Sequence, residues 1–153
     1  MKARSIVLTL TLCFVAAVCL AADLQMGTWK LNESKSKLNP EMGKNNTVVY
    51  AADGDSVKIT VDGVDGKGKA TQNEWTGKFD GKDYPVTGDP DSDTRSYKMV
   101  DDHTLAMTIK KGDKVVAEGS IVVSADGKTR TVTVNRTDSM GKQSSTTAVY
   151  DKQ

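Results

Sequence analysis

Residues 53–63 read Asp-Gly-Asp-Ser-Val-Lys-Ile-Thr-Val-Asp-Gly, with an Asp-Gly pair at each end. Between the pairs, Val57, Ile59 and Val61 alternate with polar side chains, which is typical of a strand with one buried face. Asp and Gly accept the backbone angles of tight hairpin turns, so each pair predicts a turn. The same pair recurs at Asp65-Gly66, Asp80-Gly81 and Asp126-Gly127. The sequence therefore predicts a series of antiparallel hairpins.

Segments typical of strands and turns continue to the C-terminus, and one short segment is typical of a helix. Asn32 is a capping residue and Pro40 stops a helix, so we expect at most two helical turns over residues 33–38. No crossover helix is expected, which excludes a parallel sheet. The expected strands are residues 27–31, 47–51, 57–61, 69–79, 84–87, 94–100, 104–110, 115–124, 129–136 and 144–150.

This pattern predicts an all-β fold, either an antiparallel up-and-down β-barrel or a meander, of about eight to ten strands with one short N-terminal helix. A sandwich of the same strands is an open alternative. Sequential hairpins favour the barrel, because closure leaves no unpaired strand edge. We expect residues 22–153 to form a single domain, since their length fits one hydrophobic core.

Residues 1–21 are typical of a secretory signal peptide. Two basic residues precede an apolar run over residues 5–20, and small side chains follow at Ala21 and Ala22. We expect cleavage after Ala21 or Ala22 and export to the periplasm or the extracellular space. The apolar run is short for a membrane span, so we expect no stable membrane anchor after cleavage.

The mature chain is expected to carry neither thiol chemistry nor a strong charge. Both cysteines, Cys13 and Cys19, lie in the predicted signal peptide, which excludes a disulfide or a thiolate site in the domain. Loss of Lys2 and Arg4 with that segment changes the net charge from +1 to −1. A nearly neutral protein has no field to attract nucleic acid, so we expect no nucleic-acid partner. The oligomeric state is left open.

Residues that could support catalysis or metal binding occur in patterns that favour structural roles. His103 is the only histidine, and no Gly-x-Ser-x-Gly motif accompanies it. Asp89, Asp91 and Asp93 alternate as at the start of an EF-hand loop, but the Gly and Glu required later in that loop are missing. Most other aspartates lie beside Gly, as turn residues do. We therefore expect a protein that is not an enzyme and has no catalytic residue, metal site or cofactor.

Residues 27–31, Gly-Thr-Trp-Lys-Leu, resemble the opening of the calycins, the superfamily of lipocalins and fatty-acid-binding proteins. In that family the Trp plugs the base of the barrel against an Arg from a late strand. The resemblance implies that Trp29 is the plug and Arg136 its partner. Residues 148–152 resemble the end of fatty-acid-binding proteins, where an Arg-x-Tyr pair grips the ligand carboxylate. Ala148 stands in place of that Arg, so the carboxylate clamp is incomplete.

A wider resemblance covers most of the mature chain. Residues 79–88, 124–132 and 148–152 look like a group of exported bacterial proteins of unassigned function. This likeness implies a location in the bacterial envelope and no particular chemistry.

Side chains of one parity on neighbouring strands define a candidate binding site. We expect a calycin-like barrel that binds a small apolar or amphiphilic molecule, with Arg95 as its polar anchor. The alternative is a non-enzymatic envelope or interaction module whose barrel is filled by its own Val and Thr side chains. A pocket of at least about 300 Å³ would favour binding. The expected lining residues are Trp75, Phe79, Tyr97, Met99, Leu105 and Met107.

Overall fold

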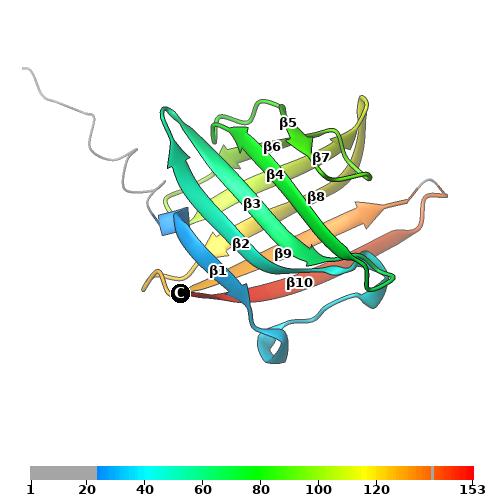
Figure 1. Cartoon of the computed structure of the whole chain (residues 1–153), viewed down its shortest axis with the longest axis horizontal. Coiled ribbons are helices and arrows are strands. Elements are labelled where there is room, and N and C mark those ends of the chain that lie inside the picture. Colours follow the sequence, from blue (N-terminus) through cyan, green and yellow to red (C-terminus); the bar gives the residue numbers. More distant parts are fainter. Residues whose placement is uncertain (1–23, 139) are drawn as a thin grey trace, which may run out of the picture.

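The chain forms a closed barrel in which each strand is antiparallel to its neighbours (Figure 1). The computed structural model describes residues 24–138 and 140–153, so the predicted signal peptide lies outside the described residues. Within them, ten strands follow one another in chain order, and β1 pairs with β10. The predicted all-β up-and-down barrel is confirmed. The strands are β1 (Gly27–Leu31), β2 (Lys44–Asp53), β3 (Ser56–Val64), β4 (Ala70–Gly77), β5 (Tyr84–Thr87), β6 (Thr94–Met99), β7 (Thr104–Lys111), β8 (Lys114–Val123), β9 (Thr129–Thr137) and β10 (Gln143–Lys152).

Four of the five Asp-Gly pairs lie at the turns that join these strands. They fall at the β2–β3, β3–β4, β4–β5 and β8–β9 connections. The turn predicted at Asp62-Gly63 is wrong, because both residues lie within β3 and pair with Gln72 and Thr71. Close packing explains this glycine, since a Cβ at Gly63 would lie 2.4 Å from the carbonyl oxygen of Lys44.

The connection between β1 and β2 forms two single turns of 3-10 helix, in place of the short helix expected over residues 33–38. The first turn, η1 (Glu33–Lys35), is capped by the side chain of Asn32, which accepts a hydrogen bond from a backbone N–H of the turn. Lys37 then forms a bridge with β10, and this tertiary pairing draws the backbone out of the helical conformation. The second turn is η2 (Pro40–Met42).

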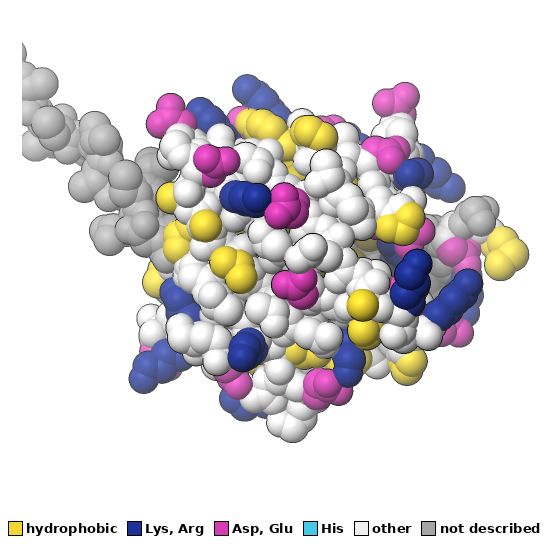
Figure 2. All heavy atoms as spheres, in the orientation of Figure 1, with side chains coloured by type: hydrophobic (Ala, Val, Ile, Leu, Met, Phe, Trp, Pro, Cys, Tyr) yellow, Lys and Arg dark blue, Asp and Glu magenta, His cyan; other side chains and the backbone are white. Residues whose placement is uncertain are grey.

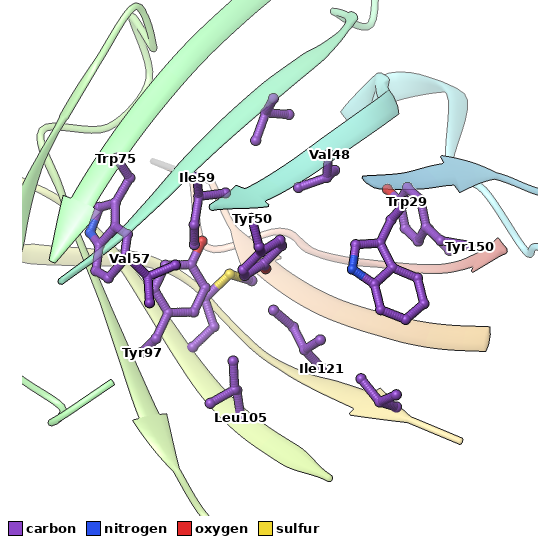
Figure 3. Close-up of a cluster of buried hydrophobic side chains, with 14 of the residues drawn as sticks. Trp29, Val48, Tyr50, Val57, Ile59, Trp75, Tyr97, Leu105, Ile121 and Tyr150 are labelled. Carbon is purple, nitrogen blue, oxygen red and sulfur yellow. The ribbon is translucent and has the colours of Figure 1, made fainter. Parts of the chain in front are cut away.

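Inward-facing side chains from all sides of the barrel form one core (Figure 3). Tyr50, Ile59 and Trp75 lie opposite one another on β2, β3 and β4, and each is at most 3% exposed. Leu105 and Ile121 form an equivalent buried pair on β7 and β8. A slip of one residue would turn each buried face to solvent, so burial of these side chains fixes the strand register.

The two ends of the barrel carry different connections and different side chains. The closed end, on the left in Figure 1, carries the β2–β3, β4–β5, β6–β7 and β8–β9 connections and residues 24–26. The open end carries the other connections, including η1 and η2. Trp29 and Arg130 near the closed end are at most 1% exposed. Partly buried apolar side chains occur at both ends: Phe79 and Met99 lie near the closed end, and Ile109 and Val134 lie towards the open end.

The surface carries no dominant charge. Figure 2 shows acidic and basic side chains spread over one face of the molecule, in keeping with the net charge of +1. Within the described ranges, no helix is long and apolar enough to cross a membrane. The same residues include no group of three or more His, Cys, Asp or Glu side chains that could hold a metal ion. The exposed large apolar side chains are Val100, Val115, Val122 and Met140.

Gly77, at the end of β4, packs against two aromatic rings and leaves no room for a side chain. A Cβ there would lie 2.5 Å from Cγ of Tyr84 and 2.6 Å from Cζ2 of Trp75. We expect Gly77→Ala to lower the free energy of unfolding by about 1–3 kcal/mol in urea denaturation, because the rings must move. The matched change at an exposed neighbour, Thr76→Ser, should stay within about 0.5 kcal/mol of wild type. Equal stability of Gly77→Ala and wild type would contradict this packing.

Candidate functional site

The apolar side chains predicted to line a ligand site meet in the core, where they pack on one another. The ring of Trp75 lies 4.7 Å from that of Tyr97 and 6.4 Å from that of Phe79, measured between ring centroids. The indole N–H of Trp75 donates to the carbonyl oxygen of Arg95 at 3.0 Å. Protein side chains therefore fill this part of the barrel. Of the predicted lining set, Trp75, Tyr97, Leu105 and Met107 are buried, and Phe79 and Met99 are partly buried.

Arg95, the predicted polar anchor, already has a carboxylate partner. Its Nη2 donates to Oδ2 of Asp89 at 2.6 Å, and its Nη1 donates to Oδ1 of Asn73 at 3.0 Å. Burial alone would raise the pKa of Asp89, but hydrogen bonds from Ser92, the backbone of Asp91 and Arg95 hold this pKa below its ordinary value. The Arg95 side chain is 9% exposed, so the ion pair ties the β5–β6 loop to the barrel wall.

Arg130 lies near the closed end among three aromatic rings. Its Cζ is 5.0 Å from the ring centroid of Trp29, 4.8 Å from that of Tyr50 and 5.0 Å from that of Tyr150. Within the described part of the chain, its Nε and Nη1 have no hydrogen-bond partner. The negative faces of the three rings therefore provide the favourable electrostatic surroundings for this buried guanidinium.

The prediction that Arg136 packs on Trp29 is wrong, because Arg136 lies at the other end of β9. Arg130 is opposite Tyr150 near the start of β9, whereas Arg136 is opposite Ser144 near its end. Both arginines have the parity of the buried face, so alternation alone does not distinguish them. In an up-and-down barrel, β1 and β9 start at the same end. Trp29 pairs with Lys152 at the end of β10, and therefore lies near the end of the barrel at which β9 begins and Arg130 is found.

Residues 24–26 complete the closed end. Gln25 is fully buried, and its carbonyl oxygen accepts a hydrogen bond from Nε1 of Trp29 at 2.9 Å. Its side-chain amide donates to the carbonyl oxygen of His103 at 3.5 Å. The carbonyl oxygen of Leu24 accepts from Nζ of Lys152 at 3.4 Å. These contacts of residues 24–26 seal the closed end. His103, considered above as a catalytic candidate, lies in the β6–β7 turn and contributes only its backbone carbonyl to this seal.

A cavity of about 320 Å³ lies at the open end, where β8 and β9 diverge. Pairing between these strands begins with Ala117 opposite Arg136, so the residues beyond this pair border a gap in the wall. The cavity has both apolar and hydrogen-bonding groups around it. None of the seven predicted ligand-binding residues borders it. Its lining includes Val115, Ala117, Asn135, Arg136, Thr137 and Ser144.

Comparisons with known proteins give likenesses to other β-barrels. No protein-family model matches the chain, and no curated protein matches its sequence. The chain is similar to a redesigned β-barrel at 13% identity and a TM-score of 0.47, covering 90% of this chain and 99% of the other. It is similar to EF1p2_mFAP2b bound to DFHBI at 14% identity and a TM-score of 0.49, and the match covers 88% of this chain and 98% of the other. The chain is also similar to lobster apocrustacyanin A1 at 15% identity and a TM-score of 0.41, and the match covers 91% of this chain and 69% of the other. Likenesses of this size carry no conclusion about function.

The aromatic surroundings of Arg130 can be tested by truncating each arginine of β9. Arg130→Ala removes three cation–π contacts and leaves a cavity, so we expect a loss of about 2–4 kcal/mol in the free energy of unfolding. Arg136→Ala removes a side chain that is 34% exposed, and its effect should stay below about 1 kcal/mol. Urea denaturation of both variants provides the measurement. A larger loss for Arg136→Ala would restore Arg136 as the residue that supports the closed end.

The buried tyrosines around Arg130 predict a loss of stability in alkali. Burial raises the pKa of Tyr150 to about 12 and also raises that of Tyr50, although Arg130 opposes both shifts. The unfolded chain releases these protons near pH 10 and the folded barrel retains them, so stability is complete below pH 10 and is lost as the pH rises further. Each tyrosine contributes up to about 1.4 kcal/mol per pH unit in this range.

We therefore expect urea denaturation at pH 9, 10 and 11 to show a steeper decline for wild type than for the double variant Tyr50→Phe, Tyr150→Phe. The variant lacks both titrating hydroxyls, so the difference between the two slopes reports these groups and excludes the common effect of lysine deprotonation. Parallel slopes would show that the tyrosines titrate alike in the folded and unfolded chains.

Proposed function

We propose that this protein is an exported, calycin-like barrel that binds a small apolar or amphiphilic molecule at its open end. The closed antiparallel barrel fits a calycin-like fold. Export is inferred from residues 1–21, which have the features of a secretory signal peptide. The place of action would be the periplasm or the outside of the cell.

One observation carries the proposal: inward-facing apolar side chains remain partly exposed towards the open end. Val134 has the parity of Arg130 on β9, and Ile109 has the parity of Leu105 on β7, yet both are only partly covered. Inward positions of a filled barrel are normally covered by neighbouring side chains at close packing. An apolar ligand beside these residues would remove their remaining surface from water.

The cavity favours a small ligand. Its volume of about 320 Å³ lies near the lower end of the range for ligand pockets, about 300–1,000 Å³. A long-chain fatty acid held by an Arg-x-Tyr clamp is disfavoured, because Ala148 replaces the Arg. Tyr150, the remaining member of that motif, packs on Arg130 near the opposite end. We therefore propose a compact ligand, such as one with two or three aromatic rings.

A filled, non-enzymatic interaction module is the second candidate. The packed rings of Trp75, Phe79 and Tyr97 support it, because they occupy the part of the barrel where a deep ligand would lie. The two candidates differ in whether a small apolar probe binds with a defined stoichiometry at the open end.

The proposal is tested by titrating the protein with the neutral fluorophore N-phenyl-1-naphthylamine. We expect saturable binding of one probe per chain. Val134→Phe, which adds volume to the inward face of β9, should weaken this binding at least about tenfold. Thr133→Phe adds a similar ring to the opposite face of the same strand and should leave the affinity within about twofold. Absence of saturable binding, or equal effects of the two variants, would favour the filled module.

A further inference from the structure

Three arginines of one parity face the interior, and they differ in how their charge is satisfied. Arg95 is paired with Asp89 at 2.6 Å, and Arg130 is 1% exposed among three rings. Arg136 differs from both, because its nearest carboxylate contact within the described ranges is Asp91, with 3.7 Å between Nη1 and Oδ2. The Asp91 side chain is 68% exposed, and an exposed pair of this length contributes little stability.

Arg136 also lies where a ligand would enter. It borders the cavity at the open end, in one inward-facing row with Ala117 and Ser144. Along the same face of β9, Val134 and Val132 continue from Arg136 towards the interior. Glu118 also borders the cavity, but it is exposed and belongs to the outward parity of β8. The Arg136 guanidinium therefore borders the cavity, and the partly buried Val134 is the next inward-facing residue on the same strand.

We propose that Arg136 binds the anionic head group of the ligand, so that the open end selects small amphiphilic anions over neutral molecules of the same shape. The inference deepens the proposed function and rests on it. The guanidinium offers paired N–H donors that match a carboxylate or sulfonate. The apolar part of the ligand then lies against Val115 and Ala117, which border the cavity, and extends inward from Arg136 towards Val134. Asp91, on the β5–β6 loop, competes with the ligand for the same guanidinium.

The experiment uses two probes that share one aromatic skeleton and differ by a sulfonate. These are 8-anilinonaphthalene-1-sulfonate, which is anionic, and N-phenyl-1-naphthylamine, which is neutral. We expect wild type to bind the anionic probe more tightly. Arg136→Gln should weaken binding of the anionic probe about tenfold and change that of the neutral probe by less than about twofold, because a charge-assisted hydrogen bond is lost. Asp91→Asn should strengthen binding of the anionic probe about twofold, since it removes the competing carboxylate.

Lys82→Gln provides the matched control for net charge. Lys82 is 79% exposed in the β4–β5 connection at the closed end, and its replacement removes the same charge far from the cavity. We expect this variant to bind both probes as wild type does. The inference is overturned if Arg136→Gln weakens both probes equally, if it weakens neither, or if Lys82→Gln has the same effect.

The outcomes also separate this inference from the proposed function. Equal wild-type affinity for the two probes, unchanged in Arg136→Gln, would reject selection by charge and leave binding at the open end intact. Failure of both probes to bind wild type would reject the proposed function and the inference together. Retained binding of the neutral probe by Arg136→Gln shows at the same time that this variant is folded.

Discussion

Pairing of the first strand with the last is the constraint on which the rest of the structure depends. The ladder between β1 and β10 joins residues far apart in sequence, as in the pair of Leu31 with Tyr150. Once this ladder forms, the sheet has no free edge, and side chains of one parity must share a single interior. Closure also brings Trp29 of β1 beside Arg130 and Tyr150, because β1 meets the β9–β10 hairpin only in a closed barrel.

Depth within this interior gives three arginines three different environments. Near the closed end, Arg130 is enclosed by aromatic faces, which accept a cation without requiring a carboxylate. On β6, Arg95 is buried but close enough to the β5–β6 loop to reach Asp89. At the open end, Arg136 keeps a third of its side-chain surface in contact with water. The same residue type thus serves packing, loop attachment and, in our proposal, recognition of an anion.

The sequence was sufficient for the architecture and insufficient for the site. Alternation of Val57, Ile59 and Val61 and the recurrent Asp-Gly pairs indicate hairpins, because both are local properties of the backbone. The pair Asp62-Gly63 misled the prediction because tertiary packing against β2, rather than a turn, requires that glycine. Parity shows which face a side chain occupies but not its depth, so Arg136 was placed at the wrong end. The cavity depends on where β8 and β9 separate, and a strand pattern contains no information about that point.

The seal formed by residues 24–26 extends the packed structure beyond the N-terminal end of β1. Strand assignment alone would start the domain at Gly27, yet the indole nitrogen of Trp29 has its hydrogen-bond partner at Gln25. A chain trimmed to the strand boundary would expose the aromatic floor of the barrel and leave a buried donor unmatched. Residues 24–26 are thus an integral part of the barrel base, and a truncation that removed them would open the closed end.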